Sequence, residues 1–91
     1  MSASIPEDAV AELRDGIAAL DAELVGLVDR RLDLVEKLWQ LKREHGLPLR
    51  APDREQWLLE HLGEIECRHL STDGLHRLHG FVLELTRSEL E

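Results

Sequence analysis

The fold is decided by residues 13–42, which read LRDGIAALDAELVGLVDRRLDLVEKLWQLK. Apolar residues recur through this stretch at steps of three and four, and this spacing predicts one stripe along a long helix. The stripe consists of Leu13, Ile17, Leu20, Leu24, Leu27, Leu34, Leu38 and Leu41. Arg31 stands where the repeat requires another apolar residue, and Lys42 lies about 20° further round the helix. Because a buried cation is costly unless an anion pairs with it, these two residues indicate an anion site.

The ends of this helix carry ordinary start and stop signals. Pro6 followed by Glu7 and Asp8 is typical of a first helical turn, and Gly46 with Pro48 is typical of a helix end. We therefore expect a helix over about residues 7–45, roughly 38 residues and about 57 Å long. A domain of this size is only about 30 Å across, so the rest of one copy cannot cover both ends of the helix. The stripe therefore predicts a partner. The simplest partner is a second copy in a two-fold dimer.

Two shorter helices are expected after a connection at 47–51. Pro52 opens the first of them, over about residues 52–67, and its predicted apolar face is Trp57, Leu58, Leu62 and Ile65. The second covers about residues 72–90, with an N-cap at one of residues 71–73. Its predicted apolar stripe is Leu75, Leu78, Val82 and Leu85. The sequence thus predicts an all-α domain over residues 1–91, with one long N-terminal helix and two shorter ones.

The composition excludes several classes of protein. A net charge of −8 argues against nucleic acid as a partner, because phosphate binding needs a basic surface. No apolar run is long enough to span a membrane, and the N-terminus does not resemble a signal peptide. The single cysteine, Cys67, fits the reducing cytoplasm, and we expect it to be a small core residue.

Four cations are candidates to line the anion site: Arg14, Arg31, Lys42 and Arg54. Arg14 lies about 25 Å before Arg31 along one helix, so a small ligand cannot touch both from the same copy. In an antiparallel dimer, Arg14 of one copy could complete a site built on the partner. The second helix would add Arg54 and Glu55, giving a dianion site with one acid. The alternative is a set of surface salt bridges, which is weaker for Arg31 and Lys42 because both face the stripe.

Other chemistries have little support in the sequence. His76 and His79 lie one turn apart, but no cysteine or carboxylate completes a convincing metal site. The serines and threonines have no evident base beside them, and the sequence has neither a phosphate-binding loop nor a dinucleotide fingerprint. We therefore expect no metal, no cofactor and no covalent catalysis.

Taken together, these residues resemble the all-helical chorismate mutase family. The resemblance is carried by Leu13-Arg14, Ile17, Leu20-Asp21, Leu24, Leu27, Arg31, Lys42, Gly46-Leu47-Pro48 and Arg54-Glu55. It covers nearly the whole chain, is strong through the first helix and the start of the second, and is looser after Leu62. It implies an intertwined homodimer that converts chorismate to prephenate by a Claisen-type rearrangement, without a cofactor.

The resemblance also implies roles for the cations. Arg14 would reach across the dimer, and Arg31 and Arg54 would bind the substrate. Lys42 would contact the ether oxygen whose bond breaks. Such a rearrangement needs a flexible dianion held in a compact conformation and stabilisation of the charge that grows on that oxygen.

Glu55 would hold the ring hydroxyl, and Thr86 would contribute to carboxylate binding. This sequence differs from the family pattern at two positions of the expected substrate site. Ala51 occupies a loop position that is often Asp, and Leu90 occupies a position that is usually Gln or Glu and pairs with the lysine at the ether oxygen. A shifted alignment would place Glu89 there, at the expense of the apolar stripe. With Leu90 we expect a slow mutase.

Three alternatives to a chorismate mutase remain open. A mutase for 4-amino-4-deoxychorismate has the same fold, and Glu55 fits either a hydroxyl or an amine. An isochorismate pyruvate lyase also shares the fold, although its loop tends to be shorter. The third is a non-catalytic helical dimer with a regulatory or partner-binding role. Some short members of the family are weak mutases activated by docking onto the first enzyme of the shikimate pathway, and this chain could be another.

Overall fold

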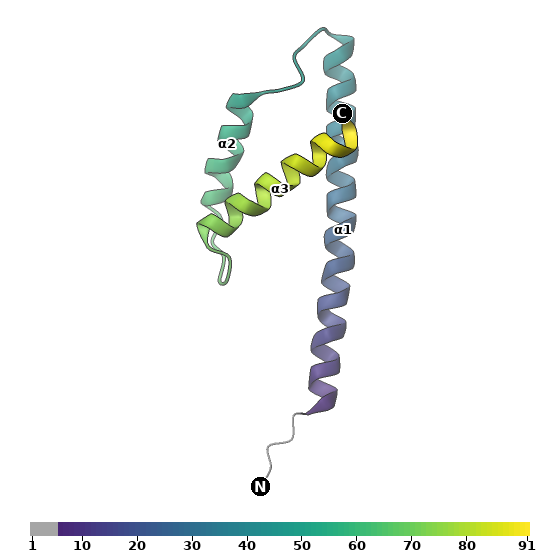
Figure 1. Ribbon diagram of the computed structural model, residues 1–91, viewed down its shortest axis with the longest axis vertical. Coiled ribbons are helices and arrows are strands. Elements are labelled where there is room, and N and C mark those ends of the chain that lie inside the picture. The colour runs from purple at the N-terminus through teal and green to yellow at the C-terminus, as the bar shows by residue number, and fades with distance from the viewer. Residues whose placement is uncertain (1–5) are drawn as a thin grey trace. The chain divides into compact units, whose positions relative to one another are not determined.

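The computed structural model describes residues 6–91, which form three helices: α1, Glu7–Glu44; α2, Pro52–Gly63; and α3, Thr72–Leu90 (Figure 1). The described residues contain no strand, which confirms the predicted all-α class. The chain divides within α1 into two compact units, one ending at Arg31 and the other formed by Leu32–Glu91. None of the described helices is long and apolar enough to cross a membrane.

The last turn of α1 closes with a Schellman motif, in which a left-handed residue turns the chain back onto the helix. Gly46 adopts a φ of 67°, the left-handed conformation expected for it. The N–H of Leu47 donates to the carbonyl of Lys42 at 2.8 Å, and that of Gly46 to the carbonyl of Arg43 at 3.2 Å. These bonds satisfy carbonyls that the helix end would otherwise leave open.

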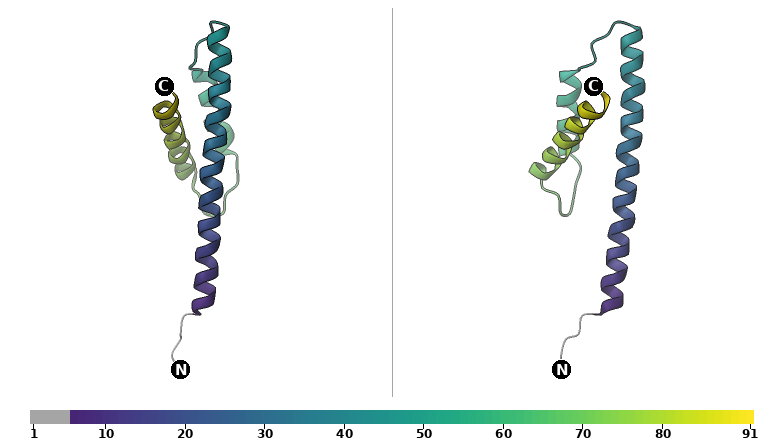
Figure 2. Two further views of the ribbon diagram at one scale, coloured as in Figure 1. Left: turned by 90° about the vertical axis from the view of Figure 1, so that its right-hand side faces the viewer. Right: turned by 45° about the vertical axis from the view of Figure 1, so that its right-hand side comes forward.

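The apolar stripe of α1 is exposed in the single chain. Its eight members, Leu13 to Leu41, are each 49–69% exposed. A second line on the helix is better covered, since Leu32 and Val35 are half-buried and Trp39 is buried. Lys42, three residues after Trp39, continues this second line. Figure 2 shows α1 as one unbroken helix from two further sides.

Helix α2 is shorter than predicted, ending at Gly63 rather than near residue 67. After Gly63 the chain tightens, with the N–H of Glu64 bonded to the carbonyl of His61 and that of Ile65 to the carbonyl of Leu62, each at 3.1 Å. The covered face is also different, because Leu58, Leu59 and Leu62 are half-buried. Trp57 and Ile65, predicted to be on the apolar face, are each 47% exposed. Cys67 is exposed as well, so the prediction of a core cysteine was wrong for this chain.

Helix α3 packs against α2 and begins at a side-chain cap. The hydroxyl of Ser71 accepts a hydrogen bond from the N–H of Gly74 at 3.0 Å. The buried residues are Leu75, His79 and Thr86, at a spacing of four and seven. Leu78, predicted to lie on this face, is 47% exposed. The covered face of α3 is therefore rotated from the predicted apolar stripe, so that it includes His79 and Thr86.

We predict that Ser71→Ala will lower the free energy of unfolding by about 1 kcal/mol, because it removes the cap of α3. Urea unfolding followed by circular dichroism at a fixed protein concentration would measure the loss. Ser88→Ala is the matched control, since the Ser88 hydroxyl donates to the carbonyl of Leu85 within the helix and caps no N-terminus. Equal stability of the two variants would contradict this role for Ser71.

Candidate functional site

Lys42 is held by the chain that follows α1. Its backbone carbonyl belongs to the Schellman motif, and its ammonium Nζ donates to the carbonyl of Leu49 at 3.3 Å. The side chain is half-buried at the end of the covered line that includes Trp39. The tight turn at Gly46 thus brings the Leu49 carbonyl back to the Lys42 ammonium. This hydrogen bond restrains a long and otherwise flexible side chain.

Glu55 lies in the first turn of α2 and forms an ion pair with Arg87 of α3. Nη2 of Arg87 lies 3.4 Å from Oε1 of Glu55, and the two side chains are 38% and 36% exposed, respectively. Sequence reasoning missed Arg87, whose place in the last turn of α3 is equally typical of a cation near a helix C-terminus. No local pattern links two residues that are 32 positions apart.

Arg54 is exposed and lies over an aromatic ring of its own helix. Its guanidinium carbon is 4.2 Å from the centroid of the Trp57 ring, a cation–π contact. On the same helix His61 stacks on Trp57, with centroids 4.7 Å apart and an interplanar angle of 15°. The three side chains follow the i, i+3, i+7 spacing of one helical face, and all three are exposed.

Thr86 and Leu90 share one face of α3, four residues apart. Thr86 is 4% exposed, and its hydroxyl donates to the carbonyl of Val82 at 2.7 Å. Leu90 is half-buried and Glu89 is exposed, so the leucine lies on the inner side of the helix end. Leu90 has no donor to offer a ligand. Ala51 provides no side-chain cap for α2.

The remaining predicted site residues, Arg14 and Arg31, belong to the first unit. Arg14 is exposed. Arg31 is half-buried, in contrast to the exposed leucines on either side of it in the stripe. Arg14 is thus open to solvent, whereas Arg31 is partly covered, and their roles stay predictions.

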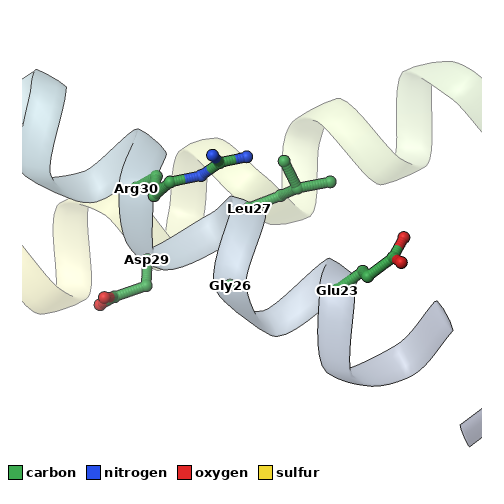
Figure 3. A pocket seen from close by; sticks show the side chains of 5 residues that line it. All are labelled: Glu23, Gly26, Leu27, Asp29 and Arg30. Carbon is green, nitrogen blue, oxygen red and sulfur yellow. The ribbon is translucent and has the colours of Figure 1, made fainter. Parts of the chain in front are cut away.

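A shallow hollow lies on α1 around Gly26, where an added Cβ would meet nothing within 4 Å. It is lined by Glu23, Gly26, Leu27, Asp29 and Arg30 (Figure 3). The side chains of Asp29 and Arg30 point away from each other, and none of the predicted site residues lines the hollow.

No three histidine, cysteine or carboxylate side chains of residues 6–91 are grouped so that they could hold a metal ion. The two histidines of α3 that were considered as a pair have different surroundings. His76 is exposed, whereas His79 is buried on the covered face.

Known proteins resemble the chain in both sequence and structure. It is 43% identical over 53 residues to a T-protein of Haemophilus influenzae, covering 58% of this chain and 14% of that protein. It is 40% identical over 47 residues to a T-protein of Enterobacter agglomerans, covering 52% of this chain and 13% of that protein. The chain thus matches only a small part of these longer relatives.

A solved structure matches far more completely. The crystal structure of chorismate mutase from Helicobacter pylori in complex with prephenate covers 89% of this chain with a TM-score of 0.79 and 33% identity, and the match takes in 88% of that chain. The sequence model of chorismate mutase type II matches residues 13–90. This match includes Arg14, most of α1, and the whole of α2 and α3. The chain therefore belongs to the chorismate mutase type II family.

Proposed function

We propose that the chain is a chorismate mutase, which converts chorismate to prephenate by a Claisen-type rearrangement. The observation that carries this proposal is the structural likeness, over 89% of the chain, to a chorismate mutase crystallised with prephenate. The family resemblance of Arg14, Arg31, Lys42, Arg54 and Glu55 supports it. A purely structural helical dimer has no need for these residues together.

In this proposal the protein restrains and stabilises the substrate rather than reacting with it. The arginines bind the two carboxylates, because the guanidinium fork matches a carboxylate. Lys42 donates to the ether oxygen as the bond to it breaks and negative charge grows there. Glu55 accepts a hydrogen bond from the ring hydroxyl. The Leu49 carbonyl supports this role for Lys42, since it restrains the ammonium before the substrate arrives.

The active form in this proposal is a homodimer formed through α1. The support is the exposed apolar stripe, whose eight side chains span about three-quarters of the helix and would otherwise face water. The family resemblance assigns Arg14 of the second copy to the substrate. We expect this dimer in the cytoplasm, where the exposed Cys67 would remain a thiol.

The test is to incubate the purified protein with chorismate and to follow the loss of its diene absorbance and the formation of prephenate. Turnover that Arg31→Ala abolishes would support the proposal. Turnover of 4-amino-4-deoxychorismate alone, or release of pyruvate from isochorismate, would replace it with one of the related enzymes. If neither turnover nor binding of a bicyclic transition-state mimic is found, a non-catalytic dimer is the better account. Adding the first enzyme of the shikimate pathway tests for activation by a partner.

We predict that Leu90→Gln will raise kcat for chorismate, by up to about 10², because a donor at this position would join Lys42 at the ether oxygen. Steady-state kinetics of the two proteins would measure the gain. Glu89→Gln, at the exposed neighbouring position, is the matched control and should leave the rate unchanged. A gain in the Glu89 variant alone would show that the other alignment of α3 is correct.

A further inference from the structure

The ion pair between Arg87 and Glu55 has a consequence for substrate choice. It joins the last turn of α3 to the first turn of α2, with 3.4 Å between Nη2 and Oε1. The Glu55 carboxylate therefore has one oxygen already bonded to a cation and a second oxygen, Oε2, left to accept from a ligand. The pair as a whole carries no net charge.

A group that donates to Oε2 also lies close to the Arg87 guanidinium. An uncharged hydroxyl can donate there without meeting a repulsion. A ring amine, which is protonated at neutral pH, would place a second cation within a few ångströms of the guanidinium. Two like charges at about 6 Å repel strongly in a partly buried site. Both side chains are more than a third exposed, so solvent screening reduces this effect to about tenfold in rate.

We propose that Arg87 determines specificity by acting through Glu55: it neutralises the carboxylate, so that the site accepts a ring hydroxyl and disfavours a ring ammonium. This inference rests on the proposed function, in which Glu55 faces the ring substituent. It assigns the chain to chorismate rather than to 4-amino-4-deoxychorismate, a choice that Glu55 alone leaves open. Arg87 is a positioning residue here and makes no contact with the reacting atoms.

The test compares kcat/KM for chorismate and for 4-amino-4-deoxychorismate in the wild type and in Arg87→Met. We expect the wild type to favour chorismate and the variant to lose about tenfold of that preference. The ratio is informative because a purely structural defect would lower both rates together. Arg87→Lys keeps the charge and should restore the preference. Arg77→Met is the matched control, because Arg77 is also an arginine of α3 that pairs with an acid. Its partner is Asp73 of the same helix, at 3.5 Å, and both side chains are exposed.

The outcomes separate this inference from the proposed function. A smaller ratio in Arg87→Met, with an unchanged ratio in Arg77→Met, supports the inference. If the ratio in Arg87→Met equals that of the wild type, the inference is wrong, whether the two kcat/KM values are kept or fall together. That result does not contradict the proposed mutase function. A wild type that favours the amine also overturns it. A wild type that turns over neither substrate overturns the proposed function and this inference with it. If Arg87→Met has lost helicity by circular dichroism, Arg87→Gln provides the same comparison.

Discussion

Replacing Lys42 with alanine will lower kcat for the conversion of chorismate to prephenate by about 10²–10³, the usual effect of removing one donor to a developing oxyanion. The effect should fall on kcat more than on KM, because the charge on the ether oxygen develops only in the transition state. In the proposed mechanism Leu90 stands in place of a second donor, so Lys42 would provide this stabilisation with little help. The expected loss therefore lies at the upper end of the range.

The control for this prediction is Lys37→Ala on the same helix. Lys37 pairs with Asp33 at 2.9 Å on the surface, where the two side chains are 69% and 60% exposed. A pair so exposed contributes little to stability, so this variant should keep the wild-type rate. If the two variants have equal kcat, Lys42 is not the donor to the ether oxygen, and its bond to Leu49 serves only to close α1.

The second large effect is expected from Leu24→Glu, which places a charge in the middle of the exposed stripe. In a two-fold dimer the substitution occurs twice, and each copy loses the burial of a leucine, about 1.5–3 kcal/mol. The dimer dissociation constant should therefore rise by at least about 10². Sedimentation velocity over a range of protein concentrations would measure it.

Ala22→Glu is the matched control, because it adds the same charge at a residue on the side of α1 opposite the stripe. This variant should sediment as the wild type does. A Leu24→Glu protein that keeps the wild-type association would show that the stripe is not the dimer interface. Loss of activity together with loss of the dimer would further support the assignment of Arg14 to the second copy.

The architecture was predictable because its signals are local. The steps of three and four along α1, Pro52 at the start of α2 and Ser71 before α3 each act through their near neighbours. The helix end at Gly46 was predicted from Gly46 and Pro48 for the same reason. The end of α2 was less predictable, since the residues after Gly63 remain reasonable helix formers and only the tightened last turn stops them.

The site was predictable only in part. The helix pattern supplied Lys42 and Glu55 as candidates and the family resemblance supplied their expected roles, but their partners depend on contacts that spacing cannot show. Arg87 reaches Glu55 from another helix, and Leu49 reaches Lys42 through a backbone carbonyl that any residue could supply. The covered face of α3 was assigned by apolarity, which passed over His79 and Thr86. A buried polar residue is identified only when the neighbouring chain is in place.

The aromatic stack on α2 gives the protein an optical reporter. Trp39 is buried, while Trp57 is nearly half exposed and contacts both the Arg54 guanidinium and the His61 ring. The two indole rings therefore differ in their exposure to water, and their fluorescence emission should differ accordingly. A ligand carboxylate that drew Arg54 away from the ring would alter the emission of Trp57 and leave that of the buried Trp39 unchanged. Substrate capture by Arg54 would thus be visible without any added label.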